Sequence, residues 1–235
     1  MKVSLIVPAY NELKTLPSLL EKLLQLDLAG EIVIVDDGSS DGTSDYLRGL
    51  KEAKVKFLIN ERNSGKGYSI RQALTIVTGD IIAIQDADLE YDPNDLLRLV
   101  EPFQAGAKVV YGSRILQKGN DMSYLRYYLG GRLLTLATNI IFNSRISDEP
   151  TGYKLFRSEI IKNLDLQSNG FEFCPEVTAK LLKNRIQIVE IPISYTPRSF
   201  AEGKKINWRD GLIAIKILLK YKFSRKSQEG LSNVQ

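Results

Sequence analysis

Short apolar runs alternate with helix-like segments through the first half of the chain. The runs are rich in β-branched residues, which is typical of buried strands, and they cover Val3–Val7, Ile32–Val35, Val55–Ile59 and Ile81–Ile84. Leucines recur at helical spacing from Leu13 to Leu24, and further helices are predicted at Ser44–Ala53 and Tyr68–Val77. Strands that alternate with helices predict an α/β fold with a mostly parallel sheet and helices on both faces.

The second half has a looser pattern. A helix over Pro93–Glu101 and a fifth strand over Lys108–Tyr111 continue the alternation, and Tyr124–Phe142, which is apolar but interrupted by glycines, predicts one or two amphipathic helices. Further along, we predict a strand at Tyr153–Phe156, a helix at Cys174–Leu182, an edge strand at Ile186–Ile193 that contains Pro192, and a helix at Trp208–Phe223 with Leu212, Ile215 and Leu219 on its apolar stripe.

Polar residues gather where the predicted strands end. The clusters are Pro8–Glu12, Asp36–Ser40, Asn63–Gly67 and Asp86–Glu90. In an open parallel sheet, ligands bind beyond the carboxyl ends of the strands. One such cluster is an ordinary turn, but four at the same edge of one sheet predict a binding site.

The fourth strand runs directly into alternating carboxylates at Asp86, Asp88, Glu90 and Asp92. Oxygen ligands of this kind suit Mg²⁺ or Mn²⁺ better than zinc. The alternative is a solvated acidic turn that caps the helix beginning at Pro93, with Asp92 as the N-cap. Asp86 and Asp88 lie too early in the chain to cap that helix.

Composition excludes several kinds of site. The chain has 235 residues, one cysteine (Cys174) and no histidine, which excludes a disulfide framework, a cysteine zinc cluster, a Ser-His-Asp triad and any histidine base. The net charge of +4 permits a phosphate-bearing or membrane-surface partner, and we expect no nucleic acid partner. We find neither a signal-peptide pattern nor a run of 18 apolar residues, so we expect a cytoplasmic protein without a transmembrane helix.

The loop around Lys66 does not match the common phosphate-binding motifs. Asn60 stands where a P-loop needs glycine, Gly67 stands where it needs Ser or Thr, and the first strand is not followed by G-x-G-x-x-G. Asp36 and Asp37 are placed to meet ribose hydroxyls or a base edge, or else form a plain Asx turn. What remains is a nucleotide site whose diphosphate is held by a metal on carboxylates, with Lys66 available to a phosphate.

Eight motifs together resemble a known family. VPAYNE (Val7–Glu12), VDDGSSDGT (Val35–Thr43), NSGKG (Asn63–Gly67), DADLEYDP (Asp86–Pro93) and YGSR (Tyr111–Arg114) resemble family 2 glycosyltransferases of the GT-A fold. The later DEPTGYKLF (Asp148–Phe156), GFEFCPEV (Gly170–Val177) and RSFAEGKKI (Arg198–Ile206) are similar to the dolichyl-phosphate mannose synthase branch. The resemblance covers about residues 2–220 in order.

The resemblance implies transfer of a sugar from a nucleotide-sugar with inversion, assisted by Mg²⁺ or Mn²⁺. By similarity, the nucleotide would be bound by Pro8, Tyr10, Glu12 and Asp37, to which the strand-end pattern adds Asp36 and Lys66. Asp86 and Asp88 match the family's D-x-D metal motif, and Glu90 stands where this branch often has Gln. That departure keeps an oxygen ligand and makes the site more anionic.

Basic residues could bind the phosphates of the substrates. The candidates are Arg114, Arg132, Arg198, Lys204 and Lys205, and the alternative, favoured for each of them taken alone, is a solvated surface group. Arg114 is favoured because it follows the metal motif by one strand. By resemblance, the loop Ser199–Lys205 is expected to close over the donor.

The acceptor decides whether a general base is required. A lipid phosphate is already anionic near neutral pH, whereas a hydroxyl needs a carboxylate base, for which Asp148 is the first candidate and Asp86 the second. We therefore take Asp86, Asp88, Arg114 and Asp148 as the candidate catalytic residues.

The main hypothesis is a polyprenyl-phosphate or dolichyl-phosphate glycosyltransferase with GDP-mannose as donor, and UDP-glucose next. The alternatives are a soluble family 2 enzyme acting on a saccharide hydroxyl and a nucleotide-binding module without catalysis. We expect one domain over residues 1–222, with a nucleotide and metal half (1–114), an acceptor half (115–222) and a disordered tail (223–235). The helices at 124–142 and 208–223 either lie in the membrane interface as peripheral anchors or pack on the sheet.

Overall fold

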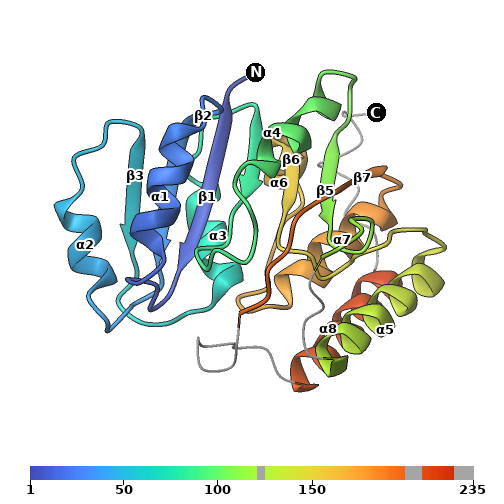
Figure 1. The fold of residues 1–235 in the computed structure, drawn as a ribbon. Coiled ribbons are helices and arrows are strands. Elements are labelled where there is room, and N and C mark those ends of the chain that lie inside the picture. The colour runs from blue at the N-terminus through green and yellow to red at the C-terminus, as the bar shows by residue number, and fades with distance from the viewer. Residues whose placement is uncertain (121–124, 199–207, 225–235) are drawn as a thin grey trace.

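The computed structural model describes residues 1–120, 125–198 and 208–224 and builds them around one mixed sheet (Figure 1). In these residues the sheet has seven strands in the order β3-β2-β1-β4-β6-β5-β7. The strands are β1 (Val3–Ala9), β2 (Ala29–Asp36), β3 (Val55–Ile59), β4 (Ile81–Ile84), β5 (Val109–Ser113), β6 (Lys154–Arg157) and β7 (Ile188–Pro192). All neighbouring pairs are parallel except the two that β6 makes with β4 and β5.

Helices cover both faces of the sheet, as the alternating pattern predicts. One face packs against α1 (Leu16–Gln25), α2 (Thr43–Gly49) and α4 (Asp95–Val100), and the other against α3 (Lys66–Leu74), α6 (Ser158–Lys162) and α7 (Phe173–Lys183). The single turn η1 (Glu101–Phe103) follows α4. Burial on both faces explains why the central strands are continuous apolar runs rather than alternating ones. The predicted fold class is confirmed.

The carboxyl ends of β1 to β5 lie along one edge of the sheet because, among the described strands, only β6 runs the other way. β1 continues through Pro8 to Ala9, beyond the predicted end at Val7. Proline is tolerated there because β4 pairs only with Val3–Ile6, so Pro8 has β2 alone as a neighbour. The polar clusters predicted to share an edge are thus brought together.

The predicted apolar stripe of the last helix lies at the edge of its packing surface, where Ile215 is partly buried. This helix, α8 (Trp208–Phe223), packs through Ala214, Leu218 and Tyr221 against α7 and against α5 (Leu125–Phe142). Leu212 and Leu219 of the predicted stripe are instead 62% and 42% exposed.

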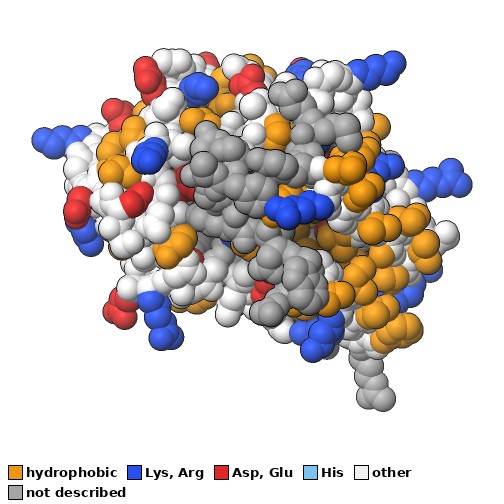
Figure 2. All heavy atoms as spheres, turned by 60° about the horizontal axis from the view of Figure 1, so that its bottom comes forward, with side chains coloured by type: hydrophobic (Ala, Val, Ile, Leu, Met, Phe, Trp, Pro, Cys, Tyr) orange, Lys and Arg blue, Asp and Glu red, His pale blue; other side chains and the backbone are white. Residues whose placement is uncertain are grey.

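The segment predicted as one or two amphipathic helices is the single helix α5. Its buried residues are the small polar Thr135 and Thr138, whereas five large apolar side chains face outwards: Leu125, Leu129, Leu133, Leu136 and Ile140. The hydroxyls of Thr135 and Thr138 donate to the carbonyls of Gly131 and Leu134 on the preceding turn. Figure 2 shows the resulting collection of hydrophobic side chains over α5 and α8.

Other boundaries differ by a few residues, and two features need correction. The helix α6 was not predicted, and Asn94, not Asp92, is the N-cap residue of α4. The Asp92 carboxylate accepts the Asn94 N–H at 3.0 Å, so it forms a turn just before the helix. The predicted tail and the loop Ser199–Lys205 lie outside the described residues, apart from 223 and 224.

Candidate active site

A tight turn after β4 holds the three candidate metal ligands. Leu89 has a positive φ of 60°, an uncommon conformation for a residue with a branched side chain. This turn lets the Glu90 N–H donate to Asp88 Oδ1 at 3.1 Å, which fixes the direction of the Asp88 carboxylate. Backbone strain of this kind gathers at functional sites.

Cationic side chains of the chain itself pair with these carboxylates. Lys66 Nζ lies 2.5 Å from Asp86 Oδ1, and Arg198 Nη2 lies 3.0 Å from Asp88 Oδ2. Arg198 also reaches Glu12 at 3.2 Å and Glu90 at 3.7 Å. All six side chains are mostly buried, so these pairs are weakly screened by solvent.

The crowded carboxylates of Asp86, Asp88 and Glu90 change the pKa values of Asp88 and of Lys66 beside it. Burial and the neighbouring carboxylates of Asp86 and Glu90 raise the pKa of Asp88 to about 7, although Arg198 opposes the shift. Burial alone would lower the pKa of Lys66. The carboxylate of Asp86 has the larger effect, so the pKa of Lys66 is raised above its ordinary value. The site therefore carries more negative charge than its two internal cations neutralise.

The loop that carries Lys66 is fixed by Asp37. The Asp37 carboxylate accepts the Gly65 N–H at 2.7 Å, the Ser64 N–H at 3.0 Å and the Asn60 side-chain amide at 2.9 Å. Gly65 and Gly67 press against the backbone of residues 168–169, where a Cβ would clash. These contacts aim Lys66 at the end of β4.

Asp36 is fully buried and accepts hydrogen bonds from the Ser39 N–H, the Ser39 hydroxyl and the Ser44 hydroxyl. These are the contacts of the plain turn that was the alternative interpretation. Pro8 and Tyr10 flank the end of β1 and are both half-buried, beside the Asp36–Asp37 loop that follows β2. Glu12 lies near the same edge and is 8% exposed.

The second part of the site is an ion pair between Arg114 and Asp148. Arg114 Nε and Nη2 donate to the two carboxylate oxygens at 2.8 and 2.7 Å, and the Arg114 backbone N–H donates at 3.0 Å. Burial would raise the pKa of Asp148, but Arg114 outweighs it and holds that pKa below its ordinary value. Asp148 is thus a weak base.

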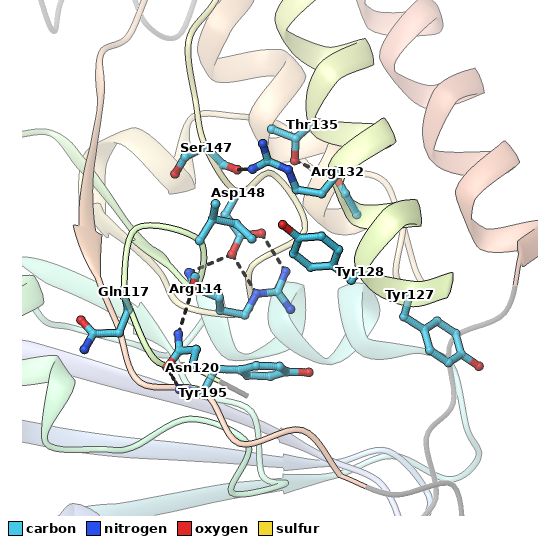
Figure 3. A pocket seen from close by; sticks show the side chains of 12 residues that line it. Arg114, Gln117, Asn120, Tyr127, Tyr128, Arg132, Thr135, Ser147, Asp148 and Tyr195 are labelled. Atoms are coloured by element: carbon cyan, nitrogen blue, oxygen red, sulfur yellow. Dashed lines mark hydrogen bonds and ion pairs between the residues drawn. The ribbon is translucent and has the colours of Figure 1, made fainter. Parts of the chain in front are cut away.

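A cavity of about 190 Å³ opens beside this ion pair. It is lined by residues from the loop after β5, from α5, from the turn before β6 and from the segment after β7, including Gln117, Asn120, Tyr128, Arg132, Thr135 and Tyr195. In Figure 3, Tyr128 and Arg132 extend from α5 towards Arg114 and Asp148, and Tyr127 points away. Arg132 is exposed, and its Nη1 donates to the Ser147 carbonyl at 3.4 Å.

Three tyrosines and a glycine connect the two parts, and sequence reasoning missed them. Tyr91 packs on Tyr153 and Tyr195 with ring centroids 4.8 and 5.7 Å apart, and its hydroxyl accepts the Gly152 N–H at 2.9 Å. Arg114 lies over the Tyr195 ring at 5.2 Å. The sequence did offer one indication of their role. Tyr91 lies in the motif DADLEYDP and Tyr153 in the motif DEPTGYKLF, the two motifs that carry the acidic residues.

Glu190 of β7 is a further residue that the sequence did not reveal. Its carboxylate accepts the Ser147 N–H at 2.8 Å and the Asp148 N–H at 3.2 Å, which orients the turn that carries Asp148. Lys204 and Lys205, two of the predicted phosphate ligands, lie outside the described residues.

The donor set fits a hard divalent cation in its chemistry. Asp86, Asp88 and Glu90 offer only oxygen, and burial together with the neighbouring carboxylates raises the pKa of Asp88, a shift that a bound cation would oppose. Among the described residues, no three acidic or cysteine side chains already converge on one point as metal ligands do. Asp86 and Asp88 instead point at Lys66 and Arg198.

Comparison with known proteins gives a consistent result. A family model described as "Glycosyl transferase family 2" matches residues 4–165. The chain is 29% identical over 212 residues to the dolichol-phosphate mannosyltransferase of Pyrococcus furiosus, a match that covers 87% of this chain and 59% of that relative. It is also 29% identical over 217 residues to the undecaprenyl-phosphate mannosyltransferase of Micrococcus luteus, covering 87% of each chain.

The solved structures that resemble this chain share its fold. Glucosyl-3-phosphoglycerate synthase from Mycobacterium tuberculosis, in complex with Mn²⁺, uridine diphosphate and phosphoglyceric acid, superimposes with a TM-score of 0.74 over 96% of this chain and 80% of that one. A second structure of that protein contains Mg²⁺ and uridine diphosphate and gives a TM-score of 0.73. The sequence identities of 18% and 20% mean that these matches show the fold alone.

Proposed function

Because this chain belongs to glycosyl transferase family 2 and is a glycosyltransferase with the GT-A fold, we propose that it moves a hexose from a nucleotide-sugar to a polyprenyl or dolichyl phosphate, with inversion at the anomeric carbon. The observation that carries the proposal is the pairing of an acidic donor site with a cationic cavity on the same sheet edge. GDP-mannose is the favoured donor and UDP-glucose the next, in line with the mannosyltransferases among its relatives.

We assign the donor to the edge formed by β1, β2 and β4. Asp86 and Asp88, with Glu90 beside them, would hold Mg²⁺ or Mn²⁺, which supplies charge neutralisation for the departing diphosphate. Pro8, Tyr10 and Glu12 border the space for the nucleoside, and Asp36 and Asp37 shape the adjoining loop. Lys66 and Arg198 already lie among the carboxylates, where they can turn to phosphate oxygens.

We assign the acceptor phosphate to the cavity beside Arg114. The guanidinium uses Nε and Nη2 on Asp148, and among the described residues its Nη1 has no hydrogen-bond partner. Arg132 adds a second positive charge from α5. Because the lowered pKa makes Asp148 a weak base, this geometry favours an acceptor that is already anionic over a hydroxyl that must lose a proton.

The outer face of α5 and α8 would bring the lipid to this cavity. Tyr128 and Arg132 line the cavity from the same helix whose adjoining outer face exposes a row of leucines. No helix in the described ranges is long and apolar enough to span a bilayer. We propose peripheral attachment to the cytoplasmic face of the membrane, with this apolar face in the interface.

Transfer assays test the proposal directly. Purified protein with Mn²⁺ or Mg²⁺, a panel of nucleotide-sugars and a polyprenyl phosphate should give glycosylated lipid, and the unphosphorylated polyprenol should give none. Product on a saccharide hydroxyl instead would contradict the acceptor assignment. Donor binding without turnover on any acceptor would indicate a binding module.

The Asp88→Ala variant tests the metal assignment, because it removes a carboxylate from the D-x-D motif. We expect turnover to fall at least a hundredfold, on the order of the loss from removing a group that stabilises transition-state charge. The matched control is Asp92→Ala in the same loop, where the carboxylate only supports the turn before α4. Near-wild-type rates in Asp88→Ala would refute the metal assignment.

A further inference from the structure

The donor site contains a positive charge where a metal ion would have to bind. We propose that Arg198 is an exchangeable internal counter-ion, which holds the acidic cluster in the absence of donor and makes binding of the divalent cation depend on the nucleotide. The inference rests on the proposed function, and it concerns the order in which that site is filled.

Arg198 gathers carboxylates from two different loops. Its Nη1 donates to both oxygens of Glu12 at 3.2 and 3.3 Å, and its Nη2 donates to Asp88 Oδ2 at 3.0 Å. Its backbone N–H donates to Glu90 Oε1 at 3.0 Å. The Arg198 side chain is only 17% exposed, so one guanidinium closes the space between the ends of β1 and β4.

Arg198 does not make all the hydrogen bonds that its guanidinium could form. Its Nε is buried without a hydrogen-bond partner, and the nearest carboxylate oxygen, on Glu90, lies 3.7 Å away. A buried donor without an acceptor is unfavourable, and a closer acceptor would remove that penalty. The oxygens of a diphosphate match the planar fork of a guanidinium and could supply that acceptor.

The charges explain why a metal ion alone should bind poorly. Glu12, Asp86, Asp88 and Glu90 bring four carboxylates, and Lys66 and Arg198 bring two cations that contact them. A divalent ion that takes Asp88 Oδ2 must displace Arg198 from the same oxygen. When the ion arrives with a nucleoside diphosphate, the displaced guanidinium gains an anionic partner. Metal and nucleotide should therefore bind cooperatively, each increasing the affinity for the other by the same factor.

Titration of Mn²⁺ tests this inference without measuring transfer. Free Mn²⁺ is followed by electron paramagnetic resonance for the wild type and for Arg198→Gln, each alone and with GDP or UDP. We expect Arg198→Gln to bind Mn²⁺ alone at least about tenfold more tightly than the wild type, because a like charge a few ångströms away is gone. We also expect the nucleotide to increase Mn²⁺ affinity less in the variant.

Two further variants sharpen the result. Arg198→Lys keeps the charge but loses the fork, so its Mn²⁺ affinity should fall between the two. Arg48→Gln removes an arginine that pairs with Asp45 at 3.0 Å on α2, and it should leave Mn²⁺ affinity unchanged. Misfolding would weaken binding, so it cannot mimic the expected gain.

Equal Mn²⁺ affinities in the wild type and Arg198→Gln, with an unchanged nucleotide effect, would overturn the inference and leave the proposed function intact. The proposed function fails separately, if polyprenyl phosphate receives no sugar while the Mn²⁺ affinities differ as expected.

Discussion

Gly152 shows how closely the two parts of the site are fitted together. A Cβ at this position would overlap Asp86 Oδ2 and lie 2.9 Å from the Tyr91 ring. We expect Gly152→Ala to push Asp86 away from the metal position and to lower turnover about a hundredfold, since small misplacements at a reacting centre have effects of that size. Steady-state rates at saturating donor and metal measure it.

The control for that substitution is Gly130→Ala in α5, where nothing lies within 4 Å of the added methyl group. Alanine in a helix interior is favoured over glycine by about 1 kcal/mol, so this variant should melt slightly higher and keep its activity. Unchanged activity in Gly152→Ala would mean that the Asp86 carboxylate can move freely.

Glu149 is a buried acid that the proposed mechanism does not use. It is fully buried, neither carboxylate oxygen has a hydrogen bond of ordinary geometry among the described residues, and burial raises its pKa above 4.5 although nearby Lys154 and Thr178 oppose the shift. A raised pKa means that the folded state holds the proton more tightly than the unfolded state. Protonated Glu149 therefore contributes to folding stability in full below pH 4.5. This contribution is lost as the pH rises through the raised pKa of Glu149 in the folded state.

We expect Glu149→Gln to remove that loss. The variant should be more stable than the wild type at pH 8, and the difference should shrink at pH 5. Urea unfolding at both pH values measures it, with the exposed Glu159→Gln as the control. A wild type that gains stability relative to Glu149→Gln as the pH rises would contradict this assignment.

At the scale of elements, the exposed apolar face of α5 and α8 is the surface that we propose to bind the membrane. Leu133 and Ile140 are 65% and 72% exposed on α5. We expect Leu133→Glu and Ile140→Glu each to weaken sedimentation with anionic phospholipid vesicles about tenfold, the effect of losing roughly 1.4 kcal/mol of apolar burial. Neither should lower the melting temperature, because neither side chain is part of the core.

The control is Leu97→Glu on α4, where an equally apolar residue is 45% exposed on another helix. That variant should bind vesicles like the wild type. If all three variants sediment alike, or if the wild type does not sediment at all, peripheral attachment through α5 and α8 is wrong.

The pattern of apolar residues predicted which elements exist better than which way they face. Strands such as β3 and β4 were placed at their observed bounds because short β-branched runs between turns have few alternatives. On α8, the spacing placed Leu212, Ile215 and Leu219 on one stripe but did not show that, of the three, Ile215 packs on the neighbouring helices while the two leucines are exposed. In α5, the buried face is formed by the small residues Thr135 and Thr138 and not by the leucines. The periodicity of apolar residues cannot predict that a helix packs through threonines. The five-residue helix α6 is too short to show a period.

The candidate site was predictable to the level of clusters but not of contacts. Parallel strands place their ends together, so the grouping of Asp37, Lys66 and Asp86 followed from the order of elements. The pairing of Arg114 with Asp148 and of Arg198 with Glu12 joins residues 34 and 186 positions apart. Spacing along the chain does not predict such pairs. The cation that pairs with a carboxylate nevertheless decides whether that carboxylate can act as a base, as asked of Asp148, or holds a counter-ion, as Glu12 does.

At the scale of the whole molecule, the predicted donor and acceptor halves share one sheet. Strand β6, from the second half, lies between β4 and β5 of the first and pairs with both. The turn that precedes β6 carries Asp148 and Gly152, so the insertion also brings the cavity beside Arg114 against Asp86. We therefore propose a single domain over residues 1–222 rather than two separable units.

This arrangement predicts how the chain unfolds. A fragment of residues 1–114 contains β1 to β5 but lacks β6 and β7, so β4 loses one neighbour and β5 loses both. We expect that fragment to show no cooperative thermal transition, whereas the full chain should unfold in one step with equal calorimetric and van't Hoff enthalpies. A chain that ends at Ser224 keeps every described element and should melt like the full chain. Two separate transitions in the full chain, or a folded fragment that binds nucleotide, would show that the first half is an independent domain.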